Sequence, residues 1–172
     1  TVILARTPGM SAEDLNRSTP QVCRNTLFIT LLCALALAVL AKPVISLLYG
    51  SAFRPAVAPL LWLLPGIVSL SICNVLSNEI AMRGRPILNA VAALVAVVIN
   101  VLLNIALIPR MGISGASLAS SISYTVTTII VIVFYRRMSK NSLGDTLVIK
   151  PEDLRMYLSV LKQGMKPVLR GN

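Results

Sequence analysis

The sequence contains no histidine, and this absence excludes several kinds of active site. Without an imidazole, the chain cannot supply a histidine metal site, a histidine proton relay or a Ser/His/Asp triad. Cysteine is scarce and odd in number: Cys23, Cys33 and Cys73 lie in or beside apolar segments and form no CxxC pair. We therefore interpret the cysteines as buried thiols and expect neither a metal ion nor a cofactor.

Charged residues are also scarce, at 13% of the 172 residues, whereas apolar residues make up 56%. A soluble domain needs a surface rich in charged residues, and this composition contains too few of them. The sequence therefore predicts an integral membrane protein. The net charge is +10, but the basic residues lie in short loops and a tail between long apolar runs. This distribution fits anionic lipid headgroups, so we expect membrane lipids as partners and no nucleic acid.

Four long apolar stretches approach the length of about 20 residues that crosses the hydrocarbon core of a bilayer. They predict membrane-spanning helices at about residues 25–49, 55–78, 86–109 and 113–135, within a transmembrane region of residues 20–135. A very short turn around Arg110 separates the last two, which predicts an antiparallel hairpin. The expected fold class is therefore all-α, with about four transmembrane helices.

Lysine and arginine are unequally divided between the two sides that four spans define. One side holds the segment 1–19 with the adjoining residues up to Arg24, the loop between the second and third spans and the tail 136–172, with 13 of the 16 basic residues. The positive-inside rule places this side, and both chain ends, in the cytoplasm. Apolar residues at helical spacing in the tail predict an interfacial amphipathic helix at about residues 151–166. Because the chain begins with Thr and lacks a signal-peptide pattern, we interpret it as the C-terminal part of a longer protein.

Asparagines form a stripe along the third predicted span. Asn89, Asn100 and Asn104 fall on one helical face, because their separations of eleven and four residues are close to whole turns. A polar stripe in a membrane helix lines a polar pathway or forms hydrogen bonds to neighbouring helices. We favour the second interpretation and keep the first as a substrate-binding hypothesis.

Three arginines gather at the predicted cytoplasmic mouth. Arg24, Arg83 and Arg85 would attract an anionic group such as a lipid diphosphate, or would serve as ordinary positive-inside anchors. The acidic residue nearest to the membrane centre is Glu79, at the cytoplasmic end of the second span. This part of the protein therefore offers no mid-membrane carboxylate for coupling transport to protons or sodium ions.

Two further motifs concern helix geometry. Pro65 and Gly66 fall near the middle of the second span, where proline predicts a kink and transporters use interrupted helices as hinges. Gly115, Ala119 and Ser123 recur every four residues in the fourth span. This pattern of small residues predicts a face for close helix packing.

Three stretches of the sequence together resemble a known family of membrane proteins. They are KPVISLLYGSAFRPAVAPLLWLLPG at residues 42–66, NEIAMRGRP at residues 78–86 and NVLLNIALIPRMGISGASLASSISY at residues 100–124. The family that they resemble is the polysaccharide biosynthesis (O-antigen-type) flippase branch of the multidrug/oligosaccharidyl-lipid/polysaccharide exporter superfamily. Its members contain 12 to 14 helices in two bundles, and this chain resembles the end of the second, C-terminal bundle.

The resemblance implies an alternating-access transporter rather than an enzyme. It would move an undecaprenyl-diphosphate-linked saccharide across a bacterial-type cell membrane, together with the missing N-terminal half of the protein. A peptidoglycan-precursor flippase of the same superfamily remains an alternative, since it shares the scaffold. A multidrug or cation antiporter is a second alternative, although it would be expected to use intramembrane carboxylates. A membrane-embedded transferase would need a group of Asp, Glu or His residues at one membrane face, and Glu79 alone is not such a group.

Overall fold

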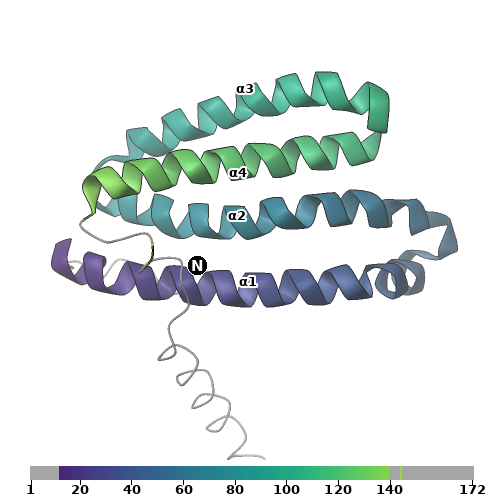
Figure 1. Ribbon diagram of the computed structural model, residues 1–172, viewed down its shortest axis with the longest axis horizontal. Coiled ribbons are helices and arrows are strands. Elements are labelled where there is room, and N and C mark those ends of the chain that lie inside the picture. The colour runs from purple at the N-terminus through teal and green to yellow at the C-terminus, as the bar shows by residue number, and fades with distance from the viewer. Residues whose placement is uncertain (1–11, 140–143, 145–172) are drawn as a thin grey trace, which may run out of the picture.

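The fold is a layer of long helices in which each helix runs antiparallel to the next one along the chain (Figure 1). The computed structural model describes residues 12–139 and Gly144. Its elements are α1 (Ala12–Tyr49), the 3-10 helix η1 (Ser51–Ala56), α2 (Val57–Met82), α3 (Pro86–Met111) and α4 (Ile113–Met138). In the described part of the chain, four helical segments are long and apolar enough to cross a membrane, and no strand occurs. The expected all-α membrane fold class is thereby confirmed.

The helices differ from the predicted spans mainly at their ends. α1 begins at Ala12 and has 38 residues, which at 1.5 Å per residue gives a length of about 57 Å. This exceeds the roughly 30 Å hydrocarbon core, so part of α1 extends beyond it. The second apolar stretch is divided into η1 and α2, and α4 continues to Met138. The predicted interfacial helix at residues 151–166 lies outside the described residues.

A single residue reverses the chain between α3 and α4. Gly112 has φ +57° and ψ −135°, a backbone conformation that L side chains rarely adopt. Glycine therefore permits α3 to end at Met111 and α4 to begin at Ile113. The two helices consequently form a tight antiparallel hairpin.

The helices are packed in the order α1, α2, α4, α3 (Figure 1). α4 lies between α2 and α3, and α1 contacts α2 on the opposite side. The larger core cluster forms at the end of the bundle where α2 and α4 finish. Its buried residues are Cys23, Cys73, Val75, Leu76, Ile80, Ala92, Val131 and Tyr135. A smaller cluster of Ala41, Ile45 and Val57 lies towards the other end.

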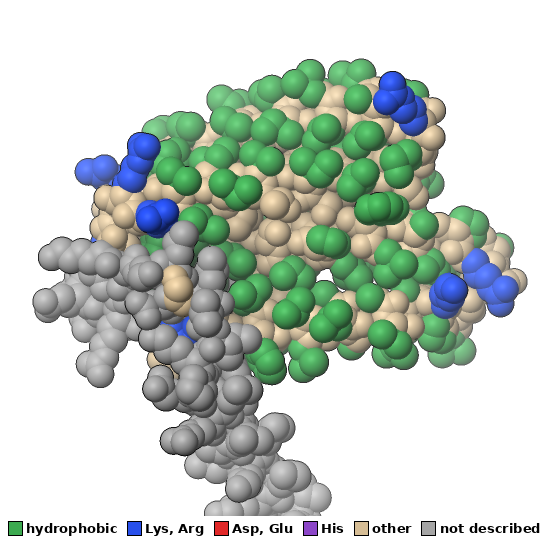
Figure 2. Space-filling view, viewed as in Figure 1, with side chains coloured by type: hydrophobic (Ala, Val, Ile, Leu, Met, Phe, Trp, Pro, Cys, Tyr) green, Lys and Arg blue, Asp and Glu red, His purple; other side chains and the backbone are tan. Residues whose placement is uncertain are grey.

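The outer helices present large apolar surfaces. In α3 the only buried residue is Ala92, although most residues of the helix are apolar. Figure 2 shows hydrophobic side chains spread over the visible face, with Lys and Arg gathered at the two ends of the helices. In water such a continuous surface would cause aggregation. Lipid tails or other membrane helices are the surroundings that suit it.

Candidate functional site

A buried ion pair lies at the end of α2. The Glu79 side chain is fully buried, and the Arg83 side chain is 13% exposed. Arg83 Nε donates a hydrogen bond of 2.8 Å to Glu79 Oε1, and Arg83 Nη2 contacts the same oxygen. The pair forms because residues four apart lie one turn from each other on a helix face.

Arg83 also connects α2 to α4. Its Nη1 donates a 3.2 Å hydrogen bond to the backbone carbonyl oxygen of Met138, in the last turn of α4. The last four carbonyl groups of a helix have no partner within the helix, so an arginine is a suitable donor for them. One guanidinium therefore neutralises a buried carboxylate and caps a neighbouring helix.

α1 contributes a second arginine to the same region. Arg24 is buried, and it adjoins the fully buried Cys23. Cys23 belongs to the same core cluster as Ile80, the residue that follows Glu79 in α2, so α1 brings Arg24 close to this end of α2. We call Arg24, Glu79 and Arg83 the Glu79 cluster; it joins α1 and α2 to the end of α4. Two guanidinium groups and one carboxylate leave the cluster with one excess positive charge.

The predicted arginine group is only partly brought together. Arg24 and Arg83 belong to the Glu79 cluster, whereas Arg85 is exposed in the turn before α3. Arg83 has a structural role that the sequence analysis did not assign to it, because its guanidinium is bound to Glu79. Binding of an anionic headgroup by these three arginines stays a prediction.

The asparagines of α3 separate into two sites. Asn89 Nδ2 donates a 2.8 Å hydrogen bond to the Ser77 carbonyl oxygen of α2. Further along the helix, Asn104 Nδ2 donates a 2.9 Å hydrogen bond to Asn100 Oδ1. The Oδ1 atoms of Asn89 and Asn104 are buried and have no hydrogen-bond partner within the described residues. Asn89 therefore links two helices, whereas Asn100 and Asn104 form a polar patch within one helix.

This difference leads to a testable prediction for the full-length protein. Asn89→Leu should lower thermal stability in detergent by about 1 kcal/mol, because a hydrogen bond between two membrane helices is lost. Asn100→Leu should cost less, since its described hydrogen bond lies within α3. Thermal unfolding of both variants measures the difference. A larger loss for Asn100→Leu, or equal losses, would contradict the division into two sites.

Gly66 lies at a close contact between α2 and α4. A Cβ atom added to Gly66 would lie 2.5 Å from Ser121 Cα and 2.9 Å from Ser121 Oγ. α2 runs without interruption from Val57 to Met82, so the helix continues across Pro65 and Gly66. The structure thus gives Gly66 a packing role, and the hinge at Pro65 and Gly66 stays a prediction.

The small-residue motif of α4 faces the neighbouring helices. A Cβ atom on Gly115 would lie 2.5 Å from the Leu107 carbonyl oxygen of α3. Ala119 is fully buried and Ser123 is almost fully buried. The Ser123 hydroxyl donates a 2.8 Å hydrogen bond to the Ala119 carbonyl oxygen, so its polarity is satisfied within α4. All three motif residues therefore lie on the buried side of the helix.

Sequence reasoning missed several polar contacts of the bundle. Thr128 Oγ1 donates a 2.9 Å hydrogen bond to the Ser69 carbonyl oxygen, which connects α4 to α2. It also lies 2.7 Å from the Tyr124 carbonyl oxygen in its own helix. The sequence did offer one signal for the Glu79 cluster, since Glu79 and Arg83 have the i, i+4 spacing of a helical ion pair. No local pattern indicated Arg24 or the carbonyl group of Met138.

Comparison with known families decides the classification. The family model described as "Lipid II flippase MurJ" matches residues 4–162. The chain belongs to the MurJ family of lipid II flippases. No curated protein and no solved structure matches the chain.

Membership of the MurJ family confirms the predicted flippase superfamily and does not support the predicted O-antigen-type branch. The three stretches that carried the resemblance consist mainly of turn and helix-packing residues. Such residues preserve a scaffold that several flippase branches share, so they indicate the scaffold better than the substrate. The family implies lipid-linked substrates within the membrane.

Proposed function

We propose that the full-length protein containing this chain moves a lipid-linked peptidoglycan precursor across the cell membrane. The observation that carries this proposal is the match of the MurJ family model to residues 4–162. The four membrane-length helices support it, because a flippase must provide a path through the whole bilayer. We further propose that the end of the bundle with the Glu79 cluster faces the cytoplasm, as the positive-inside rule predicts.

The chain would contribute part of one of two bundles that alternate between inward-open and outward-open states. Two observations support this role: Arg83 joins α2 to α4 at one end, and Cys23 packs α1 into the core cluster at the same end. Gly66 and Gly115 hold α4 tightly between α2 and α3. A bundle held at both interfaces moves as a unit, which a rocking mechanism requires.

Depletion of the full-length protein in growing cells tests the function. We expect peptidoglycan synthesis to fall and the lipid-linked precursor to accumulate in the cytoplasmic leaflet. The measurement is the amount of precursor in each leaflet, with re-expression of the wild-type gene as the control. Normal peptidoglycan with loss of a surface polysaccharide would instead identify the O-antigen-type function. Normal amounts of both polymers, with altered sensitivity to cationic drugs, would identify an antiporter.

A further inference from the structure

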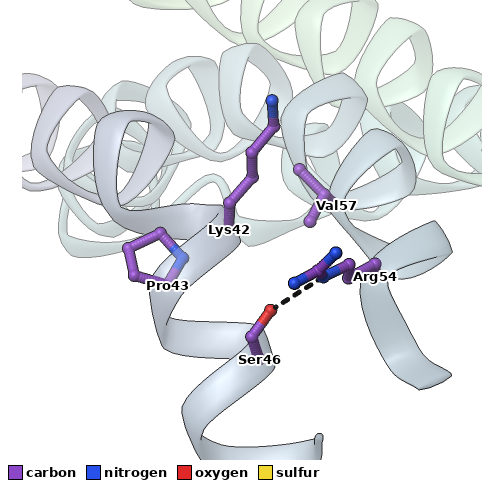
Figure 3. A pocket seen from close by; sticks show the side chains of 5 residues that line it. All are labelled: Lys42, Pro43, Ser46, Arg54 and Val57. Carbon is purple, nitrogen blue, oxygen red and sulfur yellow. Dashed lines mark hydrogen bonds between the residues drawn. The ribbon is translucent and has the colours of Figure 1, made fainter. Parts of the chain in front are cut away.

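A second basic site lies at the opposite end of the bundle from the Glu79 cluster. A pocket of about 450 Å³ opens between the last turns of α1 and the beginning of α2. Its lining residues are Lys42, Pro43, Ser46, Arg54 and Val57. Figure 3 shows the Lys42 and Arg54 side chains reaching into this space from α1 and η1. Arg54 Nε donates a 3.5 Å hydrogen bond to Ser46 Oγ, which orients the guanidinium.

The positive charge of this pocket has no acidic counterpart among the described residues that line it. No carboxylate lines the pocket, and Glu79 is the only acidic residue between positions 15 and 144 of the sequence. Glu79 is paired with Arg83 at the other end of α2. Two cations that share a pocket repel each other, and an anion between them would convert repulsion into attraction. The pocket is therefore suited to an anionic ligand.

Aromatic side chains indicate the depth of the pocket in the membrane. Tyr49 and Phe53 flank the turn from α1 to η1, with ring centroids 5.9 Å apart and exposed fractions of 65% and 56%. Exposed aromatic rings are typical of the boundary between hydrocarbon and headgroups. The turn that carries them projects beyond the turn between α3 and α4 (Figure 1). Lys42 can extend towards this boundary while its stem stays among apolar groups.

We propose that the pocket of Lys42 and Arg54 binds the phosphate group of a membrane lipid. A guanidinium matches two phosphate oxygens, an ammonium adds a point charge, and the Ser46 hydroxyl offers a further donor. Leu47 and Leu48 are exposed by 87% and 68% in the next turn of α1, where they offer an apolar surface for acyl chains. This combination of a cationic pocket with adjacent apolar side chains favours a lipid over free phosphate. The site is separate from the transport function proposed above.

Native mass spectrometry of the purified full-length protein with added phosphatidylglycerol tests the site. The double variant Lys42→Gln/Arg54→Gln should bind the lipid about 30-fold more weakly, because each basic residue near an anionic lipid contributes a factor of about 5. The matched control is Arg110→Gln, which removes an exposed basic residue at the same end of the bundle but outside the pocket. The control should keep wild-type binding. Equal losses in the control and the double variant would reduce the effect to general surface charge and overturn the proposal.

Two additional measurements protect the test against misinterpretation. The charge-conserving variant Lys42→Arg/Arg54→Lys should retain binding within about threefold, since both cations remain in the pocket. If this variant lost as much lipid binding as the double glutamine variant, positive charge at residues 42 and 54 would not explain the binding, and the proposal would be overturned. An excess of inorganic phosphate should leave the bound lipid in place. If phosphate displaced the lipid from the wild-type protein but did not displace the residual lipid from the double glutamine variant, the pocket would be assigned to free phosphate instead.

Discussion

A Gly66→Val variant of the full-length protein is expected to lose stable packing between α2 and α4. The added Cβ atom would lie 2.5 Å from the Cα atom of Ser121, which is closer than non-bonded carbon atoms approach. α4 cannot retreat without cost, because Gly115 holds it against the backbone of Leu107 on its other side. We expect a loss of about 3 kcal/mol or more, at the upper end of the range for overpacked cores. Thermal unfolding in detergent and the yield of monodisperse protein measure this loss.

The neighbouring residue provides a matched control for the Gly66 prediction. Pro65 is exposed, so Pro65→Ala removes no buried contact within the described part of the chain and should leave the protein folded. A second variant, Ser121→Gly, tests the cause of the clash. It removes the Ser121 side chain, but the nearest atom to the added Cβ belongs to the backbone. Gly66→Val should therefore stay unstable in the Ser121→Gly background, and full recovery would contradict a backbone clash.

The second large effect is expected from Arg83→Gln. This substitution leaves the fully buried Glu79 without its ion-pair partner and the Met138 carbonyl oxygen without its donor. Removal of one member of a buried ion pair costs about 3 to 5 kcal/mol. We expect the lower end of this range, because Arg24 stays near the buried carboxylate and offsets part of its charge. The double variant Glu79→Gln/Arg83→Gln should recover part of this stability, since the buried negative charge is removed too. A double-mutant cycle of thermal stabilities in the full-length protein measures the coupling.

Arg85→Gln is the control for the ion-pair prediction. Arg85 lies two residues after Arg83 but is exposed, so its loss should change stability by no more than about 0.5 kcal/mol. Both substitutions remove one positive charge from the same turn. If Arg85→Gln destabilised the protein as much as Arg83→Gln, general basic anchoring would account for both arginines. The specific role of the Glu79 cluster would then be wrong.

The candidate site was predictable only where its geometry is local. Glu79 and Arg83 are one helical turn apart, so their pairing follows from sequence spacing once α2 is a helix. Arg24 is buried near them although it lies more than fifty positions earlier in the sequence, whereas Arg85 is exposed although it is a close sequence neighbour. The asparagine stripe shows the same limit: helical periodicity places three residues on one face, but only Asn89 meets an acceptor on α2. Contacts between helices depend on how each helix is rotated about its axis and on the distance between the helices. Residue spacing along one helix determines neither quantity.

The sequence by itself determined the membrane class and the helical content, because the thickness of a bilayer sets a length that apolar runs must meet. It also determined the flippase superfamily, since turn and packing residues preserve the scaffold. Only the tertiary structure decided that Gly66 contacts α4 and that Lys42 and Arg54 share a pocket. Close approach of two helices depends on the atoms that face each other across the interface. Those atoms come from separate parts of the chain, and folding alone brings them together.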